Sequence, residues 1–210
     1  MIAPRPLLHC QRVRPPLPGS ELLTRVRDGD REARRDLFEA WAPVVLRWCV
    51  HIGGPGIDAE DAAHDVLVTA MDRLATLRQA DRFDSWMFGI TRRVLAAHRR
   101  SGWFRRWLPG VLGDVPDSAE GPGAVCERNE TVLRVRVVLD GLPTELREVL
   151  VLCEIEERPD EDVAAMLELP TGTVKSRLRR ARARFNELAR RSALAPDTLV
   201  THAGGSHDRA

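Results

Sequence analysis

Apolar residues recur along this chain with the period of an α-helix. In one segment that follows a glycine-rich break, they stand at Ala63, Val66, Ala70, Leu74 and Leu77. These offsets place the apolar side chains on one face of a helix, because an α-helix turns once every 3.6 residues. No segment of useful length alternates apolar and polar residues as a strand does. The pattern predicts an all-α fold.

Four helices are expected in the first half of the chain. The first contains Leu22, Leu23 and Val26 and ends before the turn at Asp28, and the others cover approximately residues 30–52, 58–77 and 83–100. Asp30 and Asp58 stand where the second and third of these helices begin. An aspartate at such a position caps a helix, because its carboxylate accepts hydrogen bonds from the first unpaired N–H groups. The four helices are expected to form a bundle.

Three helices are expected in the second half. The first opens at Leu142-Pro143, because proline is tolerated in the first turn of a helix. A short helix over residues 161–167 and a break over residues 168–170 follow. The last helix begins near Thr171 and carries an apolar face. Two helices joined by such a short break are typical of a helix-turn-helix.

Proline- and glycine-rich segments divide the chain. The stretch 109–123 contains Gly110, Gly113, Pro116, Gly121 and Pro122, which is the composition of a linker. We therefore expect two helical domains, 20–101 and 130–191, joined by a flexible linker over residues 102–129. Residues 1–19 and 192–210 are expected to be disordered extensions.

Composition narrows the class of protein. Hydrophobic residues make up 43% of the chain and charged residues 30%, which is ordinary for a globular protein, and the net charge of +1 favours no partner. No tract is long and apolar enough to insert in a membrane, and residues 1–19 lack the apolar core of a signal peptide, so a cytoplasmic protein is expected. Four scattered cysteines without a C-x-x-C pair predict reduced thiols and no metal site.

The last helix carries the strongest functional signal. Its apolar face contains Val174, Leu178 and Ala181, while hydroxyl and basic side chains occupy the opposite face and the first turn. Such a face suits the major groove of DNA, because arginine reads guanine edges and contacts phosphates. The candidate DNA-binding residues are Thr171, Gly172, Thr173, Lys175, Ser176, Arg177, Arg179, Arg180 and Arg182.

Residues 142–188 resemble region four of the bacterial sigma factors, the domain that reads the upstream promoter element. The most specific string is residues 170–182, although similar strings occur in response-regulator helix-turn-helix proteins. The chain departs from the sigma pattern at residues 158–160, Arg-Pro-Asp, where that family prefers a hydrophobic residue, a serine and an aromatic residue. Glu168 also replaces the common turn glycine.

The segment 58–67 resembles the acidic helix of sigma region two. In that family the helix docks on a coiled coil of the RNA polymerase clamp, which implies polymerase-binding roles for Asp61, His64 and Asp65. The residues agree with this, because residues 57–72 contain no lysine or arginine and Asp61 and Asp65 share a face. An acidic face of this kind attracts a basic partner surface.

The segment 82–93 resembles the part of sigma region two that melts the downstream promoter element. That resemblance implies stacking of unpaired bases on Phe83, Trp86 and Phe88. It also implies that basic side chains hold the phosphates, with Arg82, Arg92, Arg93, Arg99 and Arg100 as the candidates. The family usually has asparagine at the place of Arg93 and an acid at the place of Ala97.

Together the segments resemble the extracytoplasmic-function class of the sigma-seventy family. The resemblance implies a promoter-specificity subunit without enzyme activity or cofactor, which binds core RNA polymerase and promoter DNA and is in many relatives held by an anti-sigma protein. The aromatic stretch 103–108 has three open interpretations: an extension of the fourth helix, a contact to nucleic acid, or a cover for an apolar patch.

Two alternatives remain open at this point. A DNA-binding regulator with a response-regulator type of helix-turn-helix would bind its duplex site without polymerase. A metal-dependent helical hydrolase would use Asp61, His64 and Asp65 as ligands, although the other histidines form no complementary pattern.

Overall fold

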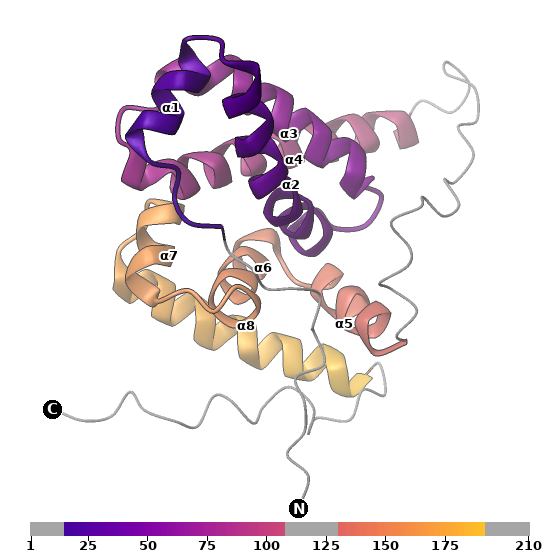
Figure 1. Cartoon of the computed structure of the whole chain (residues 1–210). Helices are drawn as coiled ribbons and strands as arrows, with labels where there is room; N and C mark the ends of the chain where they lie inside the picture. Colours follow the sequence, from indigo (N-terminus) through magenta and orange to yellow (C-terminus); the bar gives the residue numbers. More distant parts are fainter. Residues whose placement is uncertain (1–14, 108–129, 192–210) are drawn as a thin grey trace, which may run out of the picture.

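The computed structural model describes residues 15–107 and 130–191, with side chains described for 15–101 and 134–191. The described residues are helical and contain no strand, as predicted (Figure 1). The first group of helices is α1 (Ser20–Arg27), α2 (Arg31–Ile52), α3 (Ala59–Arg73) and α4 (Phe83–Trp107), with the 3-10 turns η1 (Leu74–Thr76) and η2 (Ala80–Arg82) before α4. The second group is α5 (Glu130–Asp140), α6 (Thr144–Leu150), the π-helical turn η4 (Val151–Ile155), α7 (Asp160–Leu167) and α8 (Thr171–Arg191). Of the predicted extensions 1–19 and 192–210, residues 1–14 and 192–210 lie outside the described residues, as does most of the predicted linker.

Both predicted aspartate caps are present. The carboxylate of Asp30 accepts hydrogen bonds from the backbone N–H groups of Glu32 and Ala33, at 2.9 and 3.1 Å. The carboxylate of Asp58 accepts two equivalent bonds of 3.0 Å at the start of α3. The sequence therefore predicted where α2 and α3 begin.

Two helix boundaries differ from the prediction, and one helix was not predicted. Helix α3 ends at Arg73 rather than near Leu77, because the hydroxyl of Thr76 donates to the carbonyl oxygen of Arg73 at 2.7 Å and the chain tightens into η1. Leu77 is nevertheless buried. Helix α4 continues to Trp107, beyond the predicted end near residue 100, so the backbone of residues 103–107 is helical. Helix α5 was not among the predicted helices.

Aromatic rings fill the centre of the first group of helices. The rings of Trp41 and Phe83 meet edge to face with centroids 4.9 Å apart, and those of Trp48 and Phe88 do so at 5.1 Å. All four side chains are almost completely inaccessible to solvent. Edge-to-face contacts add to the apolar burial that holds α2 and α4 together.

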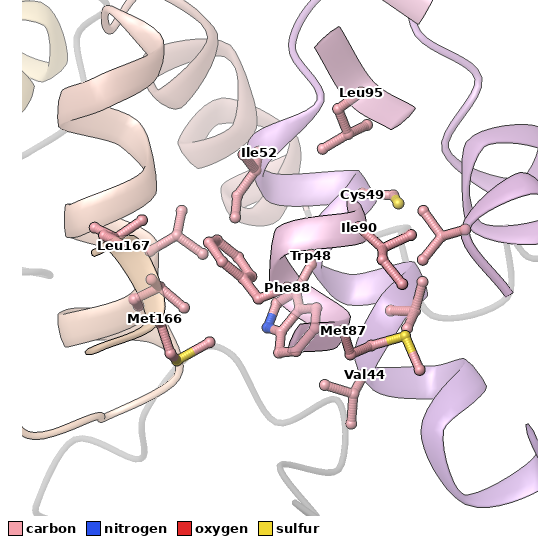
Figure 2. Close-up of a cluster of buried hydrophobic side chains, with 14 of the residues drawn as sticks. Val44, Trp48, Cys49, Ile52, Met87, Phe88, Ile90, Leu95, Met166 and Leu167 are labelled. Atoms are coloured by element: carbon pink, nitrogen blue, oxygen red, sulfur yellow. The ribbon is translucent and has the colours of Figure 1, made fainter. Parts of the chain in front are cut away.

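The two groups of helices pack against each other. Helix α7 contacts α4, and α2 contacts α5, α6 and η4, so that the buried side chains form one continuous core. In Figure 2, Met166 and Leu167 of α7 lie toward Phe88 and Ile52 of the first group. Helix α8 lies on the side of the second group that faces away from α1–α4 (Figure 1). Within the described residues, none of the helices combines the length and the apolar character needed to cross a bilayer.

Candidate nucleic-acid interface

Helices α7 and α8 form a helix-turn-helix. Helix α7 ends at Leu167, Glu168 turns the chain in the left-handed region with φ 56°, and α8 starts three residues later. Val174, Leu178 and Ala181 of α8 are buried against the rest of the second group. The predicted apolar face of the last helix is therefore confirmed.

The opposite face of α8 is open to solvent. Among the candidate DNA-binding residues, Gly172, Lys175, Ser176, Arg179, Arg180 and Arg182 are exposed, whereas Thr171, Thr173 and Arg177 are half-buried. Arg182 already has an acidic partner, because its Nε donates to Oε1 of Glu154 at 2.8 Å. The exposed face is basic over about three turns of the helix.

The acidic face of α3 is also exposed. Asp61, His64 and Asp65 all lie at the surface. Asp65 is hydrogen-bonded across to α4, because its carboxylate lies 2.8 Å from Nε2 of His98. The Asp58 cap fixes the first turn from which Asp61 projects.

The metal alternative named His64, but the structure brings a different histidine to the acidic pair. One ligand atom each from Asp61, Asp65 and His98 lie within 4.8 Å of one another, so these residues have the donors for a divalent cation. Both carboxylates are exposed, and His98 is already hydrogen-bonded to Asp65. Since that hydrogen bond accounts for the proximity of the two side chains, the cluster does not by itself require an ion.

Phe83 and Phe88, which were predicted to stack on bases, offer no exposed ring in this structure. Both side chains are 0% exposed, because Phe83 packs against Trp41 inside the first group and Phe88 lies between Trp48 and the second group. Trp86 is half-buried, and its indole N–H donates to the hydroxyl of Thr76 at 3.1 Å. Among the three predicted aromatic residues, Trp86 is the one with an accessible surface.

The basic residues of α4 and of the η2 turn before it divide into an exposed set and a half-buried set. Arg82, Arg93 and Arg100 are exposed. Arg92 is half-buried, with its Nε 3.0 Å from Oε1 of Glu148 in α6. Arg99 is half-buried as well and donates to the carbonyl oxygen of Gly53 at 3.1 Å, and burial lowers its pKa from the ordinary value.

A cleft of about 910 Å³ separates α4 from α6 and α7. One wall carries arginines and the other carries glutamates. The arginines are Arg78, Arg82, Arg92, Arg93 and Arg99, and the glutamates are Glu145, Glu148 and Glu168. The basic wall is suited to a nucleic-acid strand, whereas the opposite wall repels one.

Sequence reasoning missed the ion pairs that join the two groups of helices. Nη1 of Arg158 lies 2.5 Å from the carboxylate of Asp84 at the start of α4, and both side chains are buried. Arg47 of α2 donates from two nitrogens to Glu156, at 2.7 and 2.8 Å. The departure from the family pattern at residue 158 was the one available signal, and nothing in the sequence indicated its partner.

Both groups of helices match descriptions of one protein family. Residues 37–105 match "Sigma-70 region 2", and residues 133–185 match "Sigma-70, region 4". The chain belongs to the sigma-70 family and is an RNA polymerase sigma factor.

Its relatives specify the class within that family. The ECF RNA polymerase sigma factor SigD of Mycobacterium tuberculosis H37Rv is 30% identical over 165 residues, which cover 76% of this chain and 78% of SigD. The ECF RNA polymerase sigma factor SigM of Mycobacterium tuberculosis Erdman is 30% identical over 189 residues, or 88% of this chain and 93% of SigM. The chain is therefore a sigma factor of the extracytoplasmic-function class, as the resemblance implied, rather than a response-regulator type of protein.

Solved structures show the same fold. CnrH, in complex with the cytosolic domain of CnrY, superposes with a TM-score of 0.59 at 24% identity and covers 81% of this chain and 96% of CnrH. The sigma factor RpoE, in complex with the anti-sigma factor NepR from Bartonella quintana, gives a TM-score of 0.59 at 22% identity, with 74% of this chain and 96% of RpoE covered.

Proposed function

We propose that this sigma factor divides its contacts by charge between two domains, residues 20–101 and 130–191. The acidic face of α3 binds core RNA polymerase, and the basic face of α8 reads the upstream promoter element. The observation that carries this proposal is that both faces are exposed while their apolar sides are buried. Opposite charges on separate helices suit a basic protein surface and DNA, respectively.

The polymerase contact is assigned to Asp61, His64 and Asp65 on α3. The Asp58 cap holds the first turn of this helix, and His98 orients Asp65. Asp61 lies in the first turn of α3, where the helix dipole stabilises a carboxylate. A basic surface such as the polymerase clamp coiled coil complements it.

The upstream element is assigned to the exposed face of α8. Lys175, Ser176, Arg179 and Arg180 are assigned contacts to base edges and phosphates of a major groove, and their exposure supports this assignment. The first turn contributes through Thr171, Gly172 and Thr173, and Arg177 and Arg182 flank the groove-facing side.

The downstream element is assigned to the basic surface of α4 together with Trp86. Arg82, Arg93 and Arg100 are exposed, and Arg92 and Arg99 join them along the cleft. Electrostatic contact to a strand and stacking on one accessible ring are the two usual means of holding unpaired nucleic acid.

Catalysis in this proposal belongs to the polymerase, so the chain acts as a non-enzymatic subunit in the cytoplasm. An anti-sigma protein is a proposed further partner. Support comes from RpoE, a protein of the same fold that was solved with the anti-sigma factor NepR.

Charge reversal on α3 tests the proposal. Replacing Asp61 and Asp65 together by arginine should weaken binding to purified core polymerase by about tenfold or more, because like charges then face each other at the contact. Affinity is measured by fluorescence anisotropy of the labelled full chain. Asp36→Arg combined with Glu39→Arg, on the exposed face of α2, carries the same charge change as the matched control and should bind as the wild type does. Unchanged affinity of the α3 double variant, with an intact circular dichroism spectrum, would remove the assigned role of α3.

A further inference from the structure

The indole ring of Trp86 lies between two different surroundings. On one side it lines the cleft between α4 and α6–α7, together with Arg82 and Arg93. On the other side it lines a small apolar hollow between α2, α3 and the start of α4, where Leu67 and Met71 form part of the wall. An apolar ring gains free energy by covering apolar surface, so burial alone would draw the indole toward the hollow and away from the cleft.

A chain of two hydrogen bonds holds the ring in its observed place. Nε1 of Trp86 donates to Oγ1 of Thr76 at 3.1 Å, and this hydroxyl donates to the carbonyl oxygen of Arg73 at 2.7 Å. The two directions are compatible, because a hydroxyl has one proton to donate and lone pairs to accept with. Arg73 is the last residue of α3, and the carbonyl groups at the end of a helix lack partners within the helix. The Thr76 hydroxyl therefore ties the indole to the end of α3.

The turn that carries Thr76 is held by its neighbours as well. Leu77 is buried, and its carbonyl oxygen accepts a hydrogen bond of 2.5 Å from Nη2 of Arg27 in α1. The backbone N–H of Leu77 donates to the carbonyl oxygen of Leu74 at 3.1 Å. Since these contacts do not involve the exposed side chain of Thr76, the turn should keep its shape when the hydroxyl is removed.

We propose that Thr76 is a positioning residue for the downstream element: its hydroxyl holds the indole of Trp86 at the edge of the cleft, where the ring stacks on an unpaired base. This inference rests on the role proposed for α4 and Trp86. A ring that is fixed before the strand arrives does not have to be ordered on binding, so the strand is held more tightly. Thr76 itself needs no contact with the base.

Thr76→Val tests the proposal, because valine keeps the branched shape of threonine and replaces only its hydroxyl by a methyl group. Holoenzyme is assembled from the full chain and purified core RNA polymerase, on the genomic promoter fragment that gives the strongest run-off transcript. The reactivity of unpaired thymines with permanganate measures strand opening. The variant should lower the equilibrium constant for opening by about three- to tenfold, because the ring must then be ordered when the strand binds. Thr76→Ser retains the hydroxyl and should open the promoter as the wild type does.

A double-mutant cycle separates positioning of the ring from a general loss of stability. Trp86→Phe retains an aromatic ring but has no N–H for Thr76 to hold, so it should also reduce opening. Thr76→Val added to Trp86→Phe should cause no further loss, because the contact between the two side chains is already absent. Thr24→Val is the matched control, since Thr24 is exposed and its hydroxyl also donates to a backbone carbonyl oxygen, that of Ser20 at 2.9 Å. Its holoenzyme should open the promoter normally.

Equal opening by the Thr76→Val and wild-type holoenzymes overturns the proposal. A loss that Thr76→Ser shares, or that is as large in the Trp86→Phe background as in the wild type, overturns it too. If Thr76→Val does not fold by circular dichroism, Thr76→Ala takes its place with the same expected results. The affinity of each variant for core polymerase should match that of the wild type, because Thr76 lies beyond the end of α3 that is opposite to Asp61. If the wild-type holoenzyme opens no fragment, the proposed role of α4 fails and this inference falls with it, whereas normal opening by every variant overturns this inference alone.

Discussion

Glu168 occupies the turn of the helix-turn-helix with a left-handed backbone, at φ 56°. For a residue with a side chain this region costs about 1–2 kcal/mol, whereas glycine adopts it freely. The sequence had marked Glu168 as a departure from the usual turn glycine, and the structure shows that the turn keeps the glycine-like geometry. The local backbone energy is therefore raised at this position.

Glu168→Gly should consequently stabilise the chain. The expected gain is about 0.5–1 kcal/mol, since the relief of strain exceeds the extra backbone entropy that glycine loses on folding. Urea unfolding followed by circular dichroism measures it. Glu161→Gly inside α7 is the matched control and should destabilise by about 1 kcal/mol. A loss of stability in Glu168→Gly would show that the carboxylate contributes more than the strain costs.

Arg182 is restrained by Glu154, although it lies on the helix that we propose reads DNA. Nε of Arg182 is 2.8 Å from the carboxylate, and both side chains are partly exposed. An exposed pair of this kind is worth about 0.2–1 kcal/mol. Glu154→Gln should therefore tighten binding to a duplex promoter fragment by up to about fivefold, and Glu161→Gln should leave it unchanged. Weaker binding of Glu154→Gln would mean that the pair positions Arg182 for DNA.

At the scale of the element, the first turn of α3 contains both a stabilising helix cap and part of the proposed polymerase contact. The carboxylate of Asp58 accepts the N–H groups of Glu60 and Asp61, so the cap and the proposed polymerase contact share one turn. Asp58→Ala should destabilise the chain by about 1 kcal/mol. It should also weaken binding to core polymerase, because the first turn then frays.

Asp72→Ala, at an exposed position near the other end of α3, is the control. It should leave both the free energy of unfolding and the affinity for core polymerase nearly unchanged. Equal losses in the two variants would contradict a special role for the cap.

Helical elements were largely predictable from the sequence, because amphipathic spacing and caps are local signals. The start of α2 at Asp30 and the buried face of α8 followed directly from them. The end of α3 did not, because it depends on the Thr76 hydroxyl that turns back onto Arg73. Helix α5 is missing from the predicted helices, although it lies within the predicted second domain and its buried Val135, Val138 and Leu139 have helical spacing.

At the scale of the whole molecule, the sequence could not predict which surfaces meet. The composition of the linker indicates two separate domains. In the structure, however, the α1–α4 and α5–α8 groups pack against each other through buried ion pairs and the ring of Phe88. Asp84 and Arg158 lie 74 positions apart, and no local pattern connects them. The burial of Phe88 could not be predicted for the same reason, because it depends on a helix from the other half of the chain.

His51 makes this packing sensitive to acid. Burial lowers the pKa of His51 to about 4; nearby Arg47 and Arg136 lower it slightly further, and Glu156 partly offsets the shift. Its Nδ1 has no hydrogen-bond partner among the described residues. An unfolded histidine titrates near pH 6.5, so between about pH 4 and pH 6.5 the unfolded chain binds more protons than the folded chain. Stability should therefore rise with pH across this window and level off above it.

The free energy of unfolding at several pH values measures this effect. His51→Gln should flatten the slope between pH 4 and pH 6.5, whereas the exposed His64→Gln should retain it. An identical slope in His51→Gln and the wild type would contradict the assignment of the effect to His51.

Run-off transcription with purified core RNA polymerase and genomic promoter fragments tests the central claim most directly. The chain should confer transcripts that start at discrete sites and are absent with core polymerase alone. Replacement of Arg179 and Arg180 by alanine should abolish these transcripts while binding to core polymerase persists, because the two contacts lie on different helices. A chain that forms no complex with core polymerase and starts no transcript on any fragment would contradict the account.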